Sequence, residues 1–445
     1  MTESSEMKPA IVSETATQAG ETRAKWYWVE HSIWTERMLE ALEKGVKGGV
    51  WFSLIDKVYR PATLYAAWIT VKRNKGSEGS DHQSTDAFEA NLAAEITRLA
   101  EELRTGAYQP RPIRRVYIDK PGSKEKRPLG IPCVRDRVVQ AALRMVIEPI
   151  FEREFVGHSY GFRPGRGGKD ALREVDRLMK AGYTHVVDAD LKSYFDSIPH
   201  DLLLAEISRY IADGRVLSLI EAFLKQDILE DMTQWTPERG SPQGAVISPL
   251  LANLYLHSVD VAMVGAGFEM IRYADDLVVM CRTEQSARQG FALLDNLVTA
   301  RGLILHPEKT RLVDVSIAGE GFEFLGYRFV NGTRWPRPKS LKKLKDTIRS
   351  KTGRSSGYSL AVIIDTLNPT LRGWFEYFKH SNKWAFAPID GWVRRRLRSI
   401  LRRRIGLKGI SRGLDHRRWP NRFFRDHGLF SLVEAHAALL QSSLR

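Results

Sequence analysis

Two adjacent aspartates are the residues in this chain whose spacing most directly suggests chemistry. Asp275 and Asp276 lie between two apolar runs, which predicts a β-hairpin with both carboxylates at its tip. Two carboxylates this close resist joint ionisation unless a cation neutralises them. A plain solvated turn is the alternative, because aspartate is a common turn former. Taken alone, the pair leaves both interpretations open.

A second acidic strand upstream favours the metal-binding interpretation over the solvated turn. Asp188 and Asp190 end a short apolar run that begins at His185, and alternate residues of a strand project to the same face. Placed beside the hairpin, one of these acids completes a carboxylate trio. Three carboxylates without a histidine or cysteine pattern favour Mg²⁺ over Zn²⁺. Two Mg²⁺ ions about 3.5–4 Å apart stabilise both oxygens of a phosphoryl displacement, which is polymerase or nuclease chemistry.

Several further elements are expected around these acids. Residues 107–132 alternate toward strand and turn near residue 121, which predicts a cation-rich hairpin. Residues 86–104 have the apolar spacing of one amphipathic helix that ends at Gly106. Tryptophans between residues 26 and 68 are expected to be core residues, with base stacking as the alternative.

Composition narrows the class of partner. The 445 residues include 68 lysines and arginines against 53 acids, a net charge of +15 that suits a polyanion or a membrane surface. No apolar run reaches the ~18–20 residues of a membrane span, and residues 1–6 lack a signal peptide's apolar core. We therefore expect a cytoplasmic protein with no membrane partner. Cys133 and Cys281 are too few for a disulfide framework or a cysteine-based zinc site.

The last third of the chain is strongly basic. Cations outnumber acids eight to one over residues 337–354 and thirteen to one over residues 394–425, with aromatic residues between them. A charge run is often only a solvated face. Density this one-sided repels itself unless a polyanion is bound, so a nucleic-acid surface is favoured.

In order and spacing, these motifs resemble those of reverse transcriptases, and in particular bacterial group II intron-encoded proteins (reverse transcriptase/maturases). The resemblance covers roughly residues 60–425. The segments that carry it are residues 127–132, 159–165, 190–196, 240–253, 273–276, 324–329, 371–378 and 391–396.

The resemblance implies an α+β fold, a right-hand polymerase with mixed fingers, a ferredoxin-like palm and an α-helical thumb called domain X. The expected division is a 1–60 N-terminal extension with its first 24 or so residues disordered, 61–165 fingers, 166–335 palm, 336–425 thumb and maturase domain, and a 426–445 C-terminal tail. Many relatives add a zinc-containing endonuclease after domain X. With no cysteine after residue 281, we expect none here, so target-site priming would need a nick, a replication fork or another enzyme.

The resemblance also assigns roles to acidic residues. It selects Asp190 over Asp188 by the spacing to the following aromatic residue, which leaves Asp188 as a structural acid. The predicted catalytic and metal-binding residues are Asp190, Asp275 and Asp276, which would hold two Mg²⁺ ions. Asp275 has the stronger claim to direct metal contact, because adjacent residues on an extended tip point apart.

The resemblance assigns a nucleotide site to the hairpin and the loop. Lysine suits a compact phosphate charge and arginine a bidentate one, although Lys124 and Lys126 compete with Lys120. Phe195 would lie below the sugar and exclude a 2′-hydroxyl, with Tyr194 as the competing ring. The predicted nucleotide-binding residues are Lys120, Arg127, Phe195 and Gln243.

The partners implied are an RNA template and intron RNA, a DNA primer or target, and deoxynucleoside triphosphates. The predicted RNA-binding residues are Arg394, Arg395, Arg396, Arg402, Arg403 and Arg404. Two alternatives stay open: a splicing cofactor (maturase) that needs no polymerase activity, and a domesticated reverse transcriptase that works in defence or repair.

Overall fold

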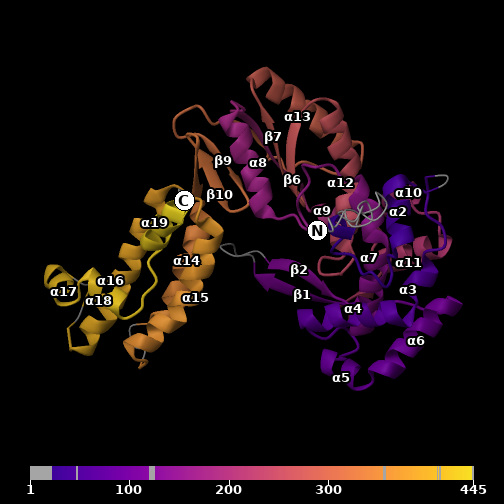
Figure 1. The fold of residues 1–445 in the computed structure, drawn as a ribbon, viewed down its shortest axis with the longest axis horizontal. Helices are drawn as coiled ribbons and strands as arrows, with labels where there is room; N and C mark the ends of the chain where they lie inside the picture. Colours follow the sequence, from indigo (N-terminus) through magenta and orange to yellow (C-terminus); the bar gives the residue numbers. More distant parts are fainter. Residues whose placement is uncertain are drawn as a thin grey trace, which may run out of the picture.

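The chain folds as an α+β protein, as predicted. The structure is a computed structural model, and it describes residues 23–46, 49–119, 126–353, 357–407, 409 and 412–442. Lys120 lies outside the described residues, and so does the predicted disordered start apart from Arg23 and Ala24, which belong to a helical turn. Figure 1 shows an indigo and purple group of helices, a central group around β6 and β7, and an orange to yellow group of helices.

The central sheet has the strand order β6-β7-β3-β8, and every neighbouring pair is antiparallel. Its elements follow along the chain as β3 (His185–Asp190), α12 (Ser248–Gly265), β6 (Glu269–Tyr273), β7 (Asp276–Cys281), α13 (Glu284–Thr299) and β8 (Arg311–Asp314). Two strand–helix–strand units interleaved in this order form a ferredoxin-like sheet. The predicted palm fold is therefore confirmed.

Strand periodicity divides the palm between two cores. Val187 and Val279 face the core that includes α12 and α13, whereas their neighbours Val186 and Val278 face the opposite side. That second side is covered by helix α8 (Gly168–Lys180) and by a sheet of order β11-β10-β9. The strands of this sheet are β9 (Gly321–Phe324), β10 (Tyr327–Val330) and β11 (Thr333–Pro336).

The fingers are built from helices and a four-stranded sheet of order β2-β1-β4-β5. Strands β1 (Ile113–Asp119) and β2 (Lys126–Ile131) form the predicted hairpin, and β4 (Ile228–Glu230) and β5 (Thr233–Trp235) join it from within the predicted palm range. The predicted fingers range holds α4 (Pro61–Asn74), α5 (Thr85–Ala90), α6 (Leu92–Thr105) and α7 (Val134–Glu154). Helices α2 (Glu36–Lys44) and α3 (Ile55–Val58) lie in the predicted N-terminal extension, and α9 (Tyr194–Ser197), α10 (His200–Ser208) and α11 (Gly214–Leu224) follow β3 within the predicted palm range.

The single helix predicted over residues 86–104 is wrong in one respect. It breaks at Asn91, where φ is −118° and ψ is 23°, to give α5 and α6. Phe88, three residues before the break, is buried against Trp68 with 4.9 Å between ring centroids, and we attribute the break to tertiary packing of this kind. Gly106 ends α6 with φ of 82°, as predicted. The core interpretation of the tryptophans is confirmed for Trp26, Trp34 and Trp68, which are buried.

The predicted helical thumb is confirmed. Its helices share one apolar core, and they are α14 (Pro338–Lys351), α15 (Leu360–Phe378), the 3-10 helix η1 (Lys383–Ala385), α16 (Phe386–Arg404), α17 (Gly413–Arg418), α18 (Asn421–Asp426) and α19 (Leu432–Ser442). Helix α19 packs on α16, and the Asp390 carboxylate accepts hydrogen bonds from the backbone of Leu432 and Val433. Leu429, Phe430, Leu432 and Ala435 of the predicted tail thus contribute to the thumb core.

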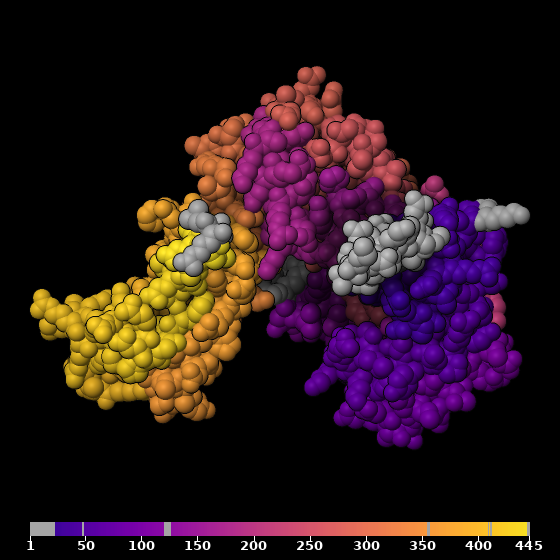
Figure 2. Space-filling model, viewed as in Figure 1, coloured from indigo at the N-terminus to yellow at the C-terminus, as the bar shows by residue number. Residues whose placement is uncertain are grey.

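The thumb stands apart from the fingers. Figure 2 shows a hollow between the yellow and orange thumb and the indigo fingers, with the palm above it. The β1–β2 hairpin points toward the thumb in Figure 1. Of the helices in the described ranges, none is both long and apolar enough to cross a membrane.

Candidate active site

The structure brings the three predicted carboxylates to one edge of the palm sheet. Strand β6 ends at Tyr273 and β7 begins at Asp276, so Ala274 and Asp275 form the connecting turn. Ala274 has φ of +58°, as tight two-residue hairpins require. Asp190 is the last residue of β3 and lies directly opposite Asp276 in the ladder. The strand, the hairpin and their juxtaposition were each expected from the sequence.

A buried ion pair holds this turn in place. Arg272 is 1% exposed, and its guanidinium donates two hydrogen bonds to Asp260 on α12, at 2.7 and 2.5 Å. Its Nη1 also donates to the Ala274 carbonyl at 3.0 Å and to the Asn253 side chain at 2.9 Å. One buried cation therefore links helix α12 to the backbone that carries Asp275.

A glycine allows a second support to approach the turn. A Cβ on Gly161 would lie 2.3 Å from the Ala274 nitrogen, a distance that no side chain tolerates. The Gly161 carbonyl accepts a hydrogen bond from Asn253 Nδ2 at 2.6 Å. Sequence reasoning missed Arg272, Asp260 and Asn253 as positioning residues. The available signal was a charge within the apolar strand β6 and two polar residues seven apart, on one face of the apolar helix α12.

Lys309 is a further residue that sequence reasoning missed. Its Nζ lies 2.6 Å from Asp190 Oδ2, and the backbone nitrogen of nearby His306 donates to the Asp190 carbonyl at 2.7 Å. Asp188, predicted to be structural, is paired with Arg311 at 3.2 Å. The two aspartates of β3 therefore have different cationic partners. Asp190 lies opposite Asp276 in the ladder, whereas Asp188 lies opposite Val278.

The predicted nucleotide-binding residues include a contact between the β1–β2 hairpin of the fingers and the loop that carries Gln243. Arg127 Nε donates to Gln243 Oε1 at 2.6 Å, although 116 residues separate the two. The Gly130 nitrogen donates to the Gln243 carbonyl at 2.7 Å. A Cβ on Gly244, where φ is +111°, would lie 2.4 Å from the Gly130 carbonyl oxygen, so only glycine fits there. Next to this contact a cavity of about 510 Å³ extends toward Trp235, large enough for a nucleotide-sized ligand.

The two candidate rings for sugar contact differ in burial. Tyr194 is 2% exposed, and its hydroxyl donates to the Ala252 carbonyl at 2.5 Å, which makes it a core residue. Phe195 is 8% exposed, and the Ser241 nitrogen donates to its carbonyl at 2.7 Å. The Phe195 backbone therefore contacts the loop that carries Gln243, and the Phe195 side chain is the less buried of the two.

Comparisons with known proteins agree with this architecture. Residues 118–329 match the family model "Reverse transcriptase (RNA-dependent DNA polymerase)", and residues 341–419 match "Group II intron, maturase-specific domain". Together the two models match more than half of the chain. The chain belongs to the group II intron-encoded reverse transcriptases.

The chain spans 38% and 56% of the length of the two curated relatives described here. The group II intron-encoded protein LtrA of Lactococcus lactis is 37% identical over 231 residues, which is 51% of this chain and 38% of that protein. Protein YkfC of Escherichia coli is 43% identical over 213 residues, 46% of this chain and 56% of that protein. A telomerase structure from Candida albicans is 12% identical with a TM-score of 0.41, over 66% of this chain and 59% of that one.

We call the cluster of Asp190, Asp275 and Asp276 the acidic edge of this reverse transcriptase. The repulsion between its carboxylates is unfavourable when no divalent cation is bound. Burial and the neighbouring Asp190 carboxylate raise the pKa of Asp275. Asp276 keeps an exposed surface, but the protein packed around it and the Asp275 and Asp190 carboxylates raise its pKa to about 6. Carboxylates that repel one another in this way are suited to bind a divalent cation.

The donor set fits a hard divalent cation, although it is not a closed cage. The oxygens of Asp190, Asp275 and Asp276 do not all lie within 4.8 Å of one another. Within the described ranges, His158, Glu174 and Glu269 form the one group of three that meets this criterion. Glu174 is already paired with Arg177 at 2.6 Å, which weakens it as a metal ligand. The ligands of the acidic edge are oxygens, as Mg²⁺ requires.

Removing one of these repelling carboxylates should stabilise the metal-free enzyme. Because the folded-state pKa of Asp276 is raised to about 6, the folded protein binds more protons than the unfolded chain between pH 4 and 6. Stability therefore falls as pH rises through that interval. We expect Asp276→Asn to raise the free energy of unfolding at pH 7.5 by about 0.5–1 kcal/mol, since solvent screens part of the repulsion. Urea titrations in EDTA should show the gain at pH 7.5 and little at pH 4.

The predicted RNA-binding arginines of α16 fall into two groups. Arg396 donates to Thr352, Arg402 to Asp415 and Arg404 to the Tyr358 carbonyl, so these three hold thumb segments together. Arg394 lies 3.9 Å from Asp390. Arg395 and Arg403 have exposed side chains and lie eight residues apart, on one face of the helix.

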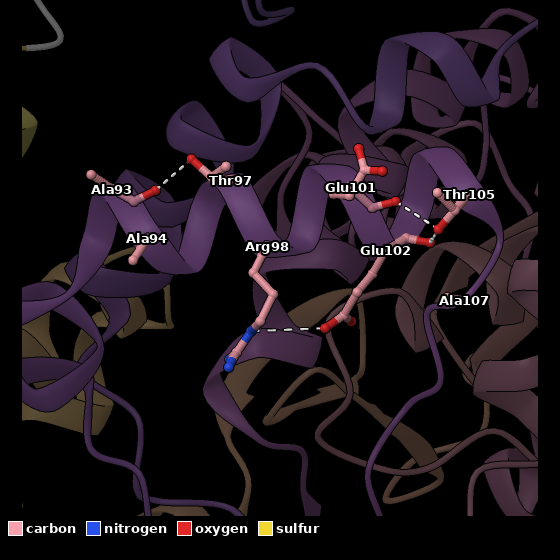
Figure 3. A pocket seen from close by; sticks show the side chains of 8 residues that line it. All are labelled: Ala93, Ala94, Thr97, Arg98, Glu101, Glu102, Thr105 and Ala107. Carbon is pink, nitrogen blue, oxygen red and sulfur yellow. Dashed lines mark hydrogen bonds and ion pairs between the residues drawn. The ribbon is translucent and has the colours of Figure 1, made fainter.

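A groove on the fingers lies apart from these features. Figure 3 shows its lining of small and charged side chains along α6, which includes Ala94, Arg98 and Glu102. The volume of the groove is about 730 Å³. Arg98 pairs with Glu102 at 3.8 Å along the same helix. Helix α6 carries none of the predicted site residues.

Proposed function

We propose that the protein is the RNA-directed DNA polymerase of a group II intron. The observation that carries the proposal is the position of Asp190 opposite Asp276 in the β3–β7 ladder, with Asp275 in the adjoining turn. The reaction proposed is in-line attack of a primer 3′-hydroxyl on the α-phosphate of a deoxynucleoside triphosphate, with pyrophosphate leaving. An RNA strand would be the template.

The residues of the chain would contribute to catalysis in two ways, by stabilising charge and by positioning the substrates. Asp190 and Asp275 would hold two Mg²⁺ ions, with Asp276 alongside, and these ions would supply charge stabilisation at the attacking and leaving oxygens. Arg127, with Lys120, would hold the triphosphate. The Arg127 contact to Gln243 would place that loop against the nucleotide and template pair. Positioning and charge stabilisation then account for catalysis.

The activity can be tested by primer extension. The full chain should extend a DNA primer on an RNA template with deoxynucleotides and Mg²⁺, and should stop when EDTA is added. Extension on a DNA template alone, with none on RNA, would contradict the proposal.

Phe195 is the proposed barrier to ribonucleotides. We expect Phe195→Val to raise ribonucleotide incorporation relative to deoxynucleotide incorporation by about 10–100-fold, because space for a 2′-hydroxyl removes a steric clash worth ~1–3 kcal/mol. Tyr194→Phe, which removes only a buried hydroxyl, is the matched control. The ratio of kcat/KM values for the two nucleotides is the measurement. An unchanged ratio in Phe195→Val would assign the role elsewhere.

A second activity, assistance of intron splicing, is favoured by the exposed cations of the thumb. Arg395 and Arg403 lie on α16, within the region that matches the maturase-specific model. Intron RNA would be held there mainly through its backbone and shape. The proposed partners are therefore intron RNA, a DNA primer or target, and deoxynucleotides, and the proposed site of action is the cytoplasm.

The thumb surface can be separated from the polymerase site. The double variant Arg395→Gln/Arg403→Gln should weaken RNA binding and reduce the slope of log affinity against log salt by about one to two. Arg209→Gln/Arg288→Gln, which removes two exposed cations elsewhere, is the matched control. A splicing assay with the flanking intron RNA distinguishes the alternatives: splicing without primer extension indicates a pure maturase, and extension without splicing indicates a domesticated enzyme.

A further inference from the structure

A histidine and two glutamates converge at the outer edge of the palm sheet. His158 precedes the Ser159–Tyr160 segment, Glu174 lies on helix α8, and Glu269 begins strand β6. One ligand atom from each of the three lies within 4.8 Å of the other two. Glu269 is four residues, or about 13 Å along a strand, from the end of β6 that leads into the catalytic turn. The cluster is therefore separate from the acidic edge.

The backbone around His158 is fixed from two sides. Its carbonyl accepts a hydrogen bond from the Arg272 nitrogen at 3.0 Å, and the Arg272 carbonyl accepts one from the Tyr160 nitrogen at 2.9 Å. This segment thus runs beside β6 as a short parallel extension of the sheet. On its other side, Nη1 of buried Arg163 donates to the Ser159 carbonyl at 2.7 Å. Because the segment is already held, an ion bound there would order little further structure.

The imidazole of His158 has a nitrogen that the protein leaves unused. Nδ1 is shielded from solvent and has no hydrogen-bond partner within the described part of the chain. It lies 3.8 Å from Glu174 Oε1, which is too far for a hydrogen bond. Two ligands bound at about 2.0–2.1 Å to one tetrahedral zinc ion are about 3.4 Å apart, so a small closure would let one ion join both atoms.

Arg177 competes with any ion for Glu174. It donates to both carboxylate oxygens of Glu174, at 2.6 and 3.0 Å. The Arg177 side chain is 58% exposed, so it can turn into solvent when an ion takes its place. An exposed ion pair of this kind is weak, and its loss should lower the affinity for an ion by no more than about 5-fold.

We propose that His158, Glu174 and Glu269 form a Zn²⁺ site, with water as the fourth ligand. An imidazole nitrogen beside two carboxylates favours a transition-metal ion, whereas Mg²⁺ prefers oxygen ligands alone. Three protein ligands and one water complete a tetrahedral zinc site. The ion would tie helix α8 and the segment at His158 to β6, the strand that carries Arg272 and leads into the catalytic turn. This inference goes beyond the proposed polymerase function and does not depend on it.

Cobalt and zinc titrations test the site without an enzymatic assay. The metal-free full chain would be kept in excess Mg²⁺, which occupies the acidic edge, and titrated with Co²⁺, whose visible absorption reports the ligands around it. Zn²⁺ would then displace the Co²⁺, and we expect one ion per chain. His158→Gln and Glu269→Gln should each weaken Zn²⁺ binding by at least ~10-fold. Arg177→Gln, which removes the competing cation, should strengthen it by about 2–5-fold.

Thermal unfolding gives a second measurement. Because Zn²⁺ would bind only the folded protein, saturating Zn²⁺ should raise the unfolding midpoint of the wild type by about 2–4 °C and that of His158→Gln by less than about 1 °C. His31→Gln removes an exposed histidine elsewhere and should behave as the wild type. Asp275→Ala/Asp276→Ala should also keep the full Zn²⁺ affinity, which separates this site from the acidic edge.

Three results would overturn the inference. The first is equal Zn²⁺ affinity in the wild type, His158→Gln and Glu269→Gln. The second is loss of the Zn²⁺ site in Asp275→Ala/Asp276→Ala, which would place the ion at the acidic edge. The third is unchanged or weaker binding in Arg177→Gln, since that variant frees Glu174. Arg177 is a surface residue, so this last comparison still decides if a ligand variant fails to fold.

Discussion

Replacing Asp275 and Asp276 together by alanine should abolish RNA-templated DNA synthesis, with a loss of at least ~10³-fold in the rate of primer extension. The two carboxylates would supply most of the negative charge that holds the divalent cations. Because burial and mutual repulsion raise the pKa of both, their removal relieves an unfavourable charge cluster. Stability should therefore be unchanged or slightly higher, and a loss of activity cannot be ascribed to unfolding.

Three measurements make this prediction specific. Single-nucleotide extension gives the rate, thermal unfolding shows that the variant folds, and Mg²⁺ titration of the wild type gives the metal dependence. Asp365→Ala, which removes an exposed carboxylate from thumb helix α15, is the control and should extend normally. Extension at the wild-type rate by the double variant would reject the assignment of the acidic edge as the active site.

The largest effect on stability is expected from replacing Arg272, the buried residue that donates a hydrogen bond to the Ala274–Asp275 turn. Arg272→Met should lower the free energy of unfolding by about 3–5 kcal/mol, because it leaves the Asp260 carboxylate buried and unpaired. Arg272→Met/Asp260→Leu should recover most of this loss, since two apolar residues can fill a space that two opposed charges occupied. Urea unfolding monitored by circular dichroism measures both effects.

Activity should not recover with stability in that double variant. The Ala274 carbonyl would still lack its 3.0 Å hydrogen bond from Arg272, so the turn that carries Asp275 would be less well positioned. We expect extension to stay at least about 10-fold below the wild type, with a higher Mg²⁺ requirement. Arg288→Met breaks an exposed pair with Glu284 and should cost less than about 1 kcal/mol. Full recovery of extension would show that Arg272 supports folding only.

Much of the candidate site could be predicted because its signals are local. The strand that ends at Asp190 and the hairpin around Asp275 are visible in short apolar runs interrupted by acids. Hairpin β1–β2 and the C-terminal end of helix α6 at Gly106 depend on turn and cap residues that act within a few positions. The basic thumb is visible in residue counts alone. The resemblance to a family then ordered these pieces along the chain.

Other features depend on contacts between residues far apart in the sequence. Lys309 reaches Asp190 across 119 residues and Arg127 reaches Gln243 across 116, and no spacing rule connects either pair. Strand β4 joins β1 in parallel although it lies within the predicted palm range. The break at Asn91 also follows from packing, because the helical pattern continues through it.

The sequence by itself thus determined the kind of chemistry, through the number and type of acids and cations and the short segments that carry them. Only the tertiary structure decided how those groups are held: Arg272 beneath the Asp275 turn, Lys309 on Asp190, and Glu174 and Glu269 beside His158. The physical reason is that periodicity and turn chemistry act over a few residues. The choice of a charge's partner depends on which surfaces pack together once the cores form.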